Sequence, residues 1–278
     1  MTVCIAAMCE GGKKIVAASD HMLSMGRFSA DGLAMKDDAV HHNWFAMWSN
    51  DVSYVPAILD CVGKQLKREE EYDWMAISTA FQNAHAAVLR SEINSGILAR
   101  HNYAIDSFYK RGKDELGPTA FSKLHREILE FSLNADFLIY GFDEEGEGHI
   151  FTFEGGITKS CDKAGMWAIG SGDYGALSTL FYFAKQNRFN QNWDYPVALY
   201  AVLAAKFMAE SAEGVGEDTF VTVNEFNHLS GYVEEKFLAK FRKNWFRRHA
   251  PKWPLSAMHE LEEHYKNYKP GKKQTIRQ

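Results

Sequence analysis

The sequence predicts a mixed α+β protein in which antiparallel β-sheets lie between layers of helices. Three observations predict this class. The chain opens on a hairpin pattern, pairs of helix-period segments then alternate with groups of strand-period segments, and the four strands expected between residues 136 and 169 follow one another without a helix. Neighbouring parallel strands need a long crossover connection, so directly connected strands favour antiparallel pairing.

The composition supports a large packed core. The chain has 278 residues, of which 46% are hydrophobic and 14% aromatic. A formal net charge of −5 gives no reason to expect a nucleic acid or an anionic membrane as a partner. Lys206 interrupts the most apolar stretch, residues 197–209, so we expect no transmembrane helix, and we recognise no signal peptide. The four cysteines lack C-x-x-C spacing, which favours a cytoplasmic location.

The first twenty residues are expected to form a β-hairpin. Apolar runs at residues 3–8 and 15–18 flank a segment with two adjacent glycines, Gly11 and Gly12, which favour turn conformations. Such a hairpin brings the start of the chain close to Asp20.

The same periodicities predict the remaining elements. The first half contains a loop at 21–32, a buried strand at 44–48, a helix capped by Asn50 or Asp51, a helix at 73–98, a charged insertion at 100–117 and a helix at 118–131. A meander of four strands follows, at 136–141, 149–153, 158–161 and 166–169. The chain then continues with helices at 173–186 and 195–211, strands at 218–224 and 228–233, and a basic aromatic helix at 234–248. We expect one domain over residues 1–250, with a helical insertion at about 100–135, and a C-terminal extension at 251–278.

The segment Gly170–Gly175 matches the dinucleotide-binding pattern G-x-G-x-x-G. That pattern belongs to a parallel strand–helix–strand unit, whereas the strands before it form an antiparallel series, so we favour a different use. A Gly-Ser-Gly segment at a strand end can expose the Ser171 hydroxyl and backbone N–H groups beside a reactive group.

Two other patterns contain residue types that are typical of metal or nucleic-acid sites. His259 and His264 are five residues apart and do not share a helix face, so no metal site is expected. The basic helix at 234–248 has the residue types of an RNA-binding face. Because the net charge is negative, docking on the body or on a neighbouring subunit is the favoured interpretation.

Thr2 carries two functional groups once Met1 is removed. Its free α-amino group, with an ordinary pKa of roughly 7.7–8.0, can accept the proton of its own hydroxyl near neutral pH. An ordinary edge strand that begins Met-Thr is the plain alternative, and position 2 by itself does not exclude it.

The chain resembles the β-subunit family of proteasomes, which belongs to the N-terminal nucleophile hydrolases. The bacterial ancestral β-subunit-like and HslV-type members are the closer comparison. The similar segments are Thr2 with its strand, Ala18-Ser19-Asp20, Lys36, the strand at 44–48 and Ala168-Ile169-Gly170-Ser171-Gly172. The resemblance implies a four-layer α-β-β-α sandwich, the N-terminal nucleophile hydrolase fold, with two antiparallel sheets between helix layers.

The resemblance also implies roles for single residues. Thr2 would be the nucleophile, Asp20 would orient Lys36, and Lys36 would lower the pKa of the Thr2 hydroxyl. Ser171 would form a hydrogen bond with the Thr2 amine.

The sequence departs from the family pattern in the surroundings of these residues. Asn50 stands where the family has a glycine that supplies an oxyanion N–H, and we expect the backbone of Asn50 to serve instead. Trp48 falls where the family lines its specificity pocket. Glu210 and Glu213 align with an Asp and a Ser that support the nucleophile, so this support is left open.

The leading hypothesis is a threonine peptidase or amidase that acts on a peptide, protein or amide substrate in a ring or stacked homo-oligomer, without a cofactor. An ATPase or unfoldase partner is not identifiable from the sequence. Two alternatives stay open: a catalytically weak, ring-forming assembly protein on the same fold, and an N-terminal nucleophile amidase for a small amide.

Overall fold

The computed structural model describes residues 2–25, 28–32, 35–67, 70–186, 193–228 and 230–249. The chain divides into two compact units, Met1–Glu234 and Glu235–Gln278. The second unit contains the expected basic helix, α6 (Glu235–Asn244), followed by a helical segment at Trp245–His249. The domain boundary expected at residue 250 and the extension at 251–278 lie outside the described residues.

The first sheet has the N-terminal hairpin near its centre. Its strand order is β10-β1-β2-β11-β12, and all neighbours are antiparallel. The strands are β1 (Cys4–Cys9), β2 (Lys14–Asp20), β10 (Met166–Ile169), β11 (Thr219–Glu225) and β12 (Gly231–Tyr232). In the hairpin turn, Gly11 and Gly12 have φ of 67° and 87°, in the left-handed region that favours glycine.

The second sheet has the order β5-β6-β7-β8-β9 and is also antiparallel throughout. Its strands are β5 (Asp37–His41), β6 (Trp44–Asn50), β7 (Ala135–Phe142), β8 (Gly148–Glu154) and β9 (Ile157–Ser160). A mixed α+β class with two antiparallel sheets is therefore confirmed.

Two expected elements are corrected. The strand at 166–169, β10, does not continue the meander but crosses to the first sheet and pairs with β1. The physical reason is burial, because Met166 and Ala168 are each 1% exposed, whereas β9 is a sheet edge on which Ile157 is 62% exposed. The segment 21–32 is not a plain loop, because β3 (Leu23–Met25) and β4 (Phe28–Ala30) pair as a short hairpin.

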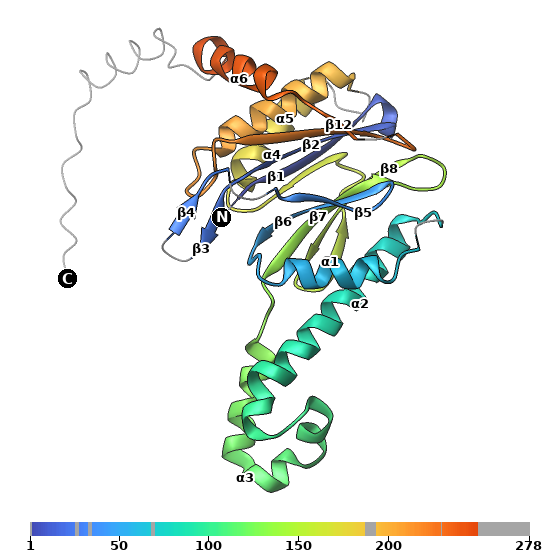
Figure 1. Ribbon diagram of the computed structural model, residues 1–278. Helices are drawn as coiled ribbons and strands as arrows, with labels where there is room; N and C mark the ends of the chain where they lie inside the picture. Colours follow the sequence, from blue (N-terminus) through green and yellow to red (C-terminus); the bar gives the residue numbers. More distant parts are fainter. Residues whose placement is uncertain are drawn as a thin grey trace, which may run out of the picture. The chain divides into compact units, whose positions relative to one another are not determined.

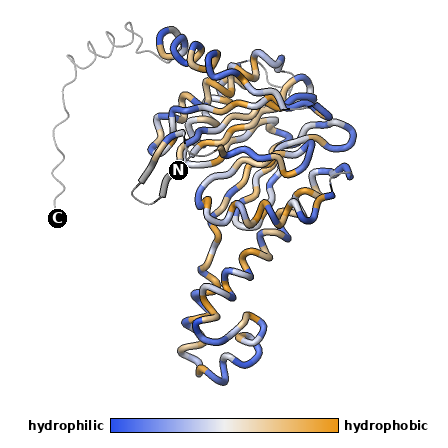
Figure 2. Tube along the Cα trace, viewed as in Figure 1, coloured by the Kyte–Doolittle hydropathy of each residue, from blue (hydrophilic) through white to orange (hydrophobic). Residues whose placement is uncertain are grey.

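The two sheets pack face to face, and helices lie on their outer sides (Figure 1). Alternate side chains of the N-terminal hairpin, such as Ala6 and Ile15, belong to one core with Met47, Leu138 and Tyr140 of the second sheet. β1 is buried on both faces, because α4 (Asp173–Gln186) and α5 (Tyr195–Ala209) pack on its other side. Figure 2 shows the hydrophobic residues concentrated along these central strands.

Helices α1 (Val55–Gly63) and α2 (Trp74–Glu92) pack on the outer face of the second sheet. Neither Asn50 nor Asp51 caps α1, contrary to expectation. The N-cap residue is Tyr54, and the Asp51 carboxylate instead accepts a hydrogen bond from the Ser53 N–H at 2.9 Å.

The insertion is more helical than expected. α3 (Ile105–Glu130) begins well before residue 118. Gly117, with φ of 75°, breaks the regular helix directly before Pro118, so the proline does not have to fit inside a continuous helix and the segments on both sides remain helical. The helix expected at 73–98 ends as α2 at Glu92, and irregular helical turns continue to His101. A small separate core holds this region together; its buried members are Ile93, Ile97, Leu98, Tyr103, Phe108, Leu124 and Ile128.

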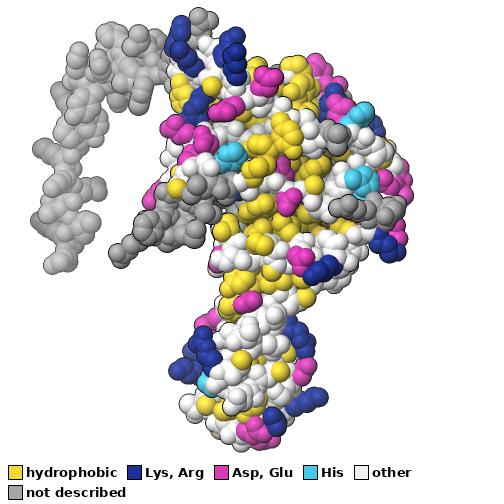
Figure 3. Space-filling model, viewed as in Figure 1, with side chains coloured by type: hydrophobic (Ala, Val, Ile, Leu, Met, Phe, Trp, Pro, Cys, Tyr) yellow, Lys and Arg dark blue, Asp and Glu magenta, His cyan; other side chains and the backbone are white. Residues whose placement is uncertain are grey.

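In the described part of the chain, no helix combines the length and the hydrophobicity needed to cross a membrane. Figure 3 shows one face of the molecule, on which hydrophobic side chains gather over the sheets and acidic and basic side chains are interspersed around them.

Candidate functional site

The strand registers bring the start of the chain to a junction of three segments. Cys4 of β1 is paired with Ser19 of β2 on one side and with Ile169 of β10 on the other. Thr2, two residues before Cys4, therefore lies beside the end of β2 and beside the Gly-Ser-Gly segment that follows β10. Segments that are distant in sequence meet here because β1 is an interior strand.

Thr2, Asp20 and Lys36 form a buried cluster. The Thr2 hydroxyl donates to Asp20 Oδ1, and Lys36 Nζ donates both to Thr2 Oγ1 and, at 2.7 Å, to Asp20 Oδ1. All three side chains are at most 2% exposed. Lys36 directly precedes β5 of the second sheet, so the cluster joins the two sheets at one end of the sandwich.

The charges of this cluster suit activation of a hydroxyl. A cation next to Thr2 Oγ1 favours the alkoxide form over the neutral hydroxyl, and burial strengthens that effect. Asp20 compensates the charge of Lys36, and its second oxygen, Oδ2, accepts the N–H of Gly216 at 2.8 Å. Both carboxylate oxygens of Asp20 are therefore hydrogen-bonded, which fixes the orientation of the carboxylate.

Cys4 is a second nucleophilic side chain near this cluster, and its chemistry differs. Burial raises the pKa of the Cys4 thiol far above its ordinary value, although the charge of Lys36 acts in the opposite direction. The thiol donates to the carbonyl oxygen of Trp48 at 3.3 Å. A buried, protonated thiol is a poor nucleophile, so the arrangement favours Thr2 as the reactive group.

Ser171 lies at the backbone nitrogen of Thr2. This nitrogen, a peptide N–H while Met1 is attached, donates to Ser171 Oγ at 3.2 Å. The Gly172 N–H donates to the Thr2 carbonyl at 3.2 Å. Ser171 Oγ also lies 3.3 Å from two acceptors, the carbonyl oxygens of Thr2 and Glu213.

The glycines of the G-x-G-x-x-G match are explained by contacts within the protein. Gly170 has φ of 97°, and a Cβ there would lie 2.4 Å from the Thr2 carbonyl oxygen. A Cβ at Gly172 would lie 2.8 Å from Val215, and one at Gly175 would lie 3.3 Å from the Ala209 backbone. Close approach to Thr2 and α5 therefore accounts for this pattern.

Asn50 ends β6 in the left-handed region, with φ of 68°, and its side-chain amide donates to Asp136 at 2.5 Å. The next residue, Asp51, donates its N–H across the ladder to the Asn134 carbonyl at 2.9 Å. Ser49 lies within β6, and across an extended residue the following N–H and the preceding C=O point to the same side, so the Asn50 N–H points to the same side of β6 as the Trp48 carbonyl. Trp48 points its carbonyl the same way, toward Cys4, so this side of β6 faces the N-terminal strand.

The Trp48 side chain is half-buried and packs with the core between the second sheet and the helices α1 and α2. Its role as part of a specificity pocket stays a prediction.

Glu210 and Glu213, whose support of the nucleophile was left open, make different kinds of contact. The Glu210 carboxylate accepts from Lys206 Nζ at 2.7 Å, and Lys206 is fully buried in α5. Glu213 contributes its backbone carbonyl, which accepts from Ser171. Lys206 and Gly216 are the residues at this site that sequence reasoning missed. The signal that could have identified Lys206 is that it is the single charged residue within the otherwise largely apolar sequence of α5.

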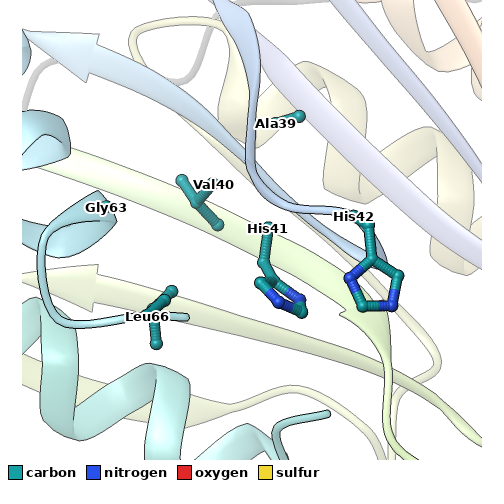
Figure 4. A pocket seen from close by; sticks show the side chains of 6 residues that line it. All are labelled: Ala39, Val40, His41, His42, Gly63 and Leu66. Atoms are coloured by element: carbon teal, nitrogen blue, oxygen red, sulfur yellow. The ribbon is translucent and has the colours of Figure 1, made fainter. Parts of the chain in front are cut away.

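A separate cavity of about 690 Å³ lies at the edge strand β5. It is lined by Ala39, Val40, His41, His42, Gly63 and Leu66, none of which belongs to the Thr2 cluster (Figure 4). Burial and the neighbouring His42 lower the pKa of His41, which favours the neutral imidazole, and its Nε2 lies 3.2 Å from the Lys67 carbonyl oxygen. Within the described residues, no group of three or more His, Cys, Asp or Glu side chains is arranged to hold a metal ion.

Comparisons with models of known protein families and with curated proteins find no match. The Thr2 cluster combines a hydroxyl, a cation, a carboxylate and the backbone nitrogen of Thr2 within hydrogen-bonding distance of its partners.

Proposed function

We propose that this chain is an N-terminal threonine hydrolase of the proteasome β type, which cleaves peptide or amide bonds after removal of Met1. One observation carries the proposal: the Thr2 hydroxyl contacts Lys36 and Asp20 while the nitrogen of the same residue contacts Ser171. A structural threonine at a strand end needs neither a buried cation nor a second hydroxyl at its nitrogen. The two stacked antiparallel sheets with outer helices are compatible with the fold of N-terminal nucleophile hydrolases.

In the proposed reaction, the free amine of Thr2 accepts the proton of its own hydroxyl, directly or through a water, and Oγ1 bonds to the carbonyl carbon of the substrate. Lys36 stabilises the developing negative charge on Oγ1, and the Asn50 N–H stabilises the oxyanion. Collapse of this intermediate breaks the C–N bond, and the leaving amine takes the proton from the Thr2 ammonium. The Thr2 amine then deprotonates a water, whose oxygen bonds to the ester carbon; the C–Oγ1 bond breaks, the carboxylic acid leaves, and Oγ1 regains its proton from the Thr2 ammonium. The scheme needs no cofactor.

The proposed assembly is a homo-oligomeric ring or stack that acts on peptide or protein substrates; an ATPase partner is not specified. Exposed aromatic side chains on α4 support it, since Phe181 and Tyr182 are 43% and 59% exposed. Phe81 of α2, by contrast, is buried in the core. Light scattering that gives only a species of 31.6 kDa, the mass of one chain, would contradict an oligomer.

A catalytically weak, ring-forming protein on the same fold is the second candidate. The observation that favours it is that the Glu210 carboxylate pairs with Lys206, at the position where the family has an Asp that supports the nucleophile. An amidase for a small amide would use the same chemistry and would differ in substrate size.

The decisive experiment combines intact mass with an epoxyketone probe. The probe forms a stable ring only with a hydroxyl and a free amine on one residue, so we expect loss of Met1 and labelling of Thr2 alone. Thr2→Ala should abolish labelling, Thr2→Ser should retain part of it, and Thr79→Ala on the exposed face of α2 serves as the matched control. Lys36→Ala should lower the rate by about 10²–10⁴-fold while a folded protein remains.

Two results would contradict the proposal. A retained Met1 in the cellular protein excludes the amine as base. Labelling that persists in Thr2→Ala, or that moves to Cys4 or Ser171, identifies a different nucleophile. An assembled, processed protein that does not react at all would support the weakly active assembly protein.

A further inference from the structure

Lys206 is a buried cation that the proposed mechanism does not use. Its side chain is 0% exposed, and its ammonium donates to Glu210 Oε1 at 2.7 Å, to the Gly216 carbonyl at 2.6 Å and to the Glu217 carbonyl at 3.1 Å. Removing an ammonium from water is costly unless it is paired and hydrogen-bonded, so these acceptors are held firmly around it. Two of the acceptors are backbone carbonyls of the segment 210–218, which connects α5 to β11.

The same segment reaches both halves of the Thr2 cluster. The Gly216 N–H donates to Asp20 Oδ2 at 2.8 Å, on the hydroxyl side. The Glu213 carbonyl accepts from Ser171 Oγ at 3.3 Å, on the side of the Thr2 nitrogen. The position of one backbone segment therefore influences both the carboxylate that holds Lys36 and the hydroxyl that contacts the Thr2 nitrogen.

Asp31 holds the segment from its other side. Asp31 Oδ2 accepts the N–H groups of Glu217 at 2.6 Å and Asp218 at 3.1 Å. Gly216 is tightly enclosed, because a Cβ there would lie 2.3 Å from Asp31 Oδ1. With Asp31 on the N–H groups and Lys206 on the carbonyls, the peptide groups at 216–218 have little freedom to rotate.

We propose that Lys206 is a positioning residue for the Thr2 site. It acts through Gly216, whose N–H holds Asp20 Oδ2 so that Oδ1 faces Lys36 and Thr2. The inference deepens the proposed hydrolase and rests on it. A purely structural Lys206 would stabilise the fold without changing the reactivity of Thr2 in the molecules that are folded.

The test uses two variants in the full, processed chain. Lys206→Met removes the ammonium and keeps a long side chain. Because Lys206→Met removes the cation that pairs with Glu210, the second variant combines Lys206→Met with Glu210→Gln and so leaves no uncompensated charge from this pair. If the single variant does not fold, the double variant is measured instead. Lys185→Met, at an exposed position of α4, is the matched control.

The first readout is amide hydrogen exchange, which does not depend on activity. Exchange in residues 213–218 and at Asp20 should increase about tenfold, as expected when a hydrogen bond to a charged group is lost, while exchange in β6 and β7 stays as in the wild type. Asp20→Asn should loosen residues 213–218 in the same way. If exchange at these residues is unchanged in a folded Lys206 variant, the inference is overturned.

The second readout is the rate of epoxyketone labelling as a function of probe concentration. The maximal labelling rate should fall by about 10²-fold, the size typical of a reacting group displaced by about 1 Å, while the half-saturating probe concentration changes little. A variant that is less stable but labels at the wild-type maximal rate would show that Lys206 is only structural. If the wild type itself is not labelled, the proposed function fails, and the exchange readout alone then decides whether Lys206 controls the position of Asp20.

Discussion

Replacing Asp37 by asparagine should remove the loss of stability that the wild type undergoes as the pH rises from about 4 to 6. Asp37 Oδ2 accepts hydrogen bonds from the Tyr140 hydroxyl at 2.8 Å and the Thr222 hydroxyl at 3.2 Å, which link the two sheets. Its Oδ1 is buried and has no hydrogen-bond partner among the described residues. Burial raises the pKa of the Asp37 carboxyl from 3.8 to about 6, although the hydrogen bonds from Tyr140 and Thr222 lower it. The folded protein therefore holds this proton more tightly than the unfolded chain does.

The sign of the effect follows from the order of the two pKa values. Between pH 3.8 and about 6 the unfolded chain has lost the proton that the folded protein retains, so the free energy of unfolding falls as pH rises. At about 1.4 kcal/mol per pH unit between the two values, the full cost is about 3 kcal/mol and is present above pH 6. At pH 5 about half of this cost is already present.

The side-chain amide of the Asp37→Asn variant cannot ionise, and it keeps an oxygen acceptor for Tyr140 and Thr222. We therefore expect the free energy of unfolding of the variant, relative to that of the wild type, to rise by about 1.4 kcal/mol between pH 5 and pH 8. A pH-independent cost of about 1–3 kcal/mol offsets this gain, because the amide N–H groups take the place of the unpartnered Oδ1. Urea denaturation followed by circular dichroism at several pH values measures this difference. Asp38→Asn, at the exposed neighbouring position, is the control. A difference between Asp37→Asn and the wild type that does not vary with pH would refute the reasoning.

Two further predictions concern Gly170 and His149. Gly170→Ala should displace Thr2, because a Cβ at residue 170 would lie 2.4 Å from the Thr2 carbonyl oxygen. We expect epoxyketone labelling of this variant to slow by about 10²-fold. The control is Gly155→Ala, which is also at positive φ but has open space around its Cβ and should keep the wild-type labelling rate. Equal rates in the two variants would show that contact with Thr2 does not matter. His149 lies 2.9 Å from Asp162 and 3.1 Å from Asp143, and these bonds raise the pKa of its imidazole although burial opposes the rise. The bonds should stabilise the fold fully below the ordinary pKa of about 6.5 and lose this effect as pH rises through the folded pKa, so His149→Gln should lower the melting temperature more at pH 6 than at pH 9. A loss that is larger at pH 9 would contradict this assignment.

The N-terminal hairpin, the two helix pairs and the antiparallel character of the sheets were predictable from the sequence because each depends on a local pattern. Adjacent glycines mark the turn of β1 and β2, and apolar residues at helical spacing mark α2. The proximity of Thr2 to Asp20 was also predictable, since a tight hairpin places its two ends side by side. Lys36 was identified through the family resemblance, and Ser171 already through the Gly-Ser-Gly segment at a strand end. The structure brings both to Thr2, but their catalytic roles stay predictions.

Other features were decided only by the tertiary structure. β10 has the same apolar pattern as the strands before it, and its place beside β1 depends on which sheet leaves its side chains buried. Asp37 and Lys206 are charged residues that a sequence pattern places at the surface, yet each satisfies hydrogen bonds across elements that are distant in sequence. The link from Lys206 through Gly216 to Asp20 runs through backbone atoms, which every residue possesses, and so it leaves no signature in the side-chain sequence. The sequence by itself thus determined the elements and the chemical groups of the candidate site, whereas long-range burial and backbone hydrogen bonding decided how those groups are held.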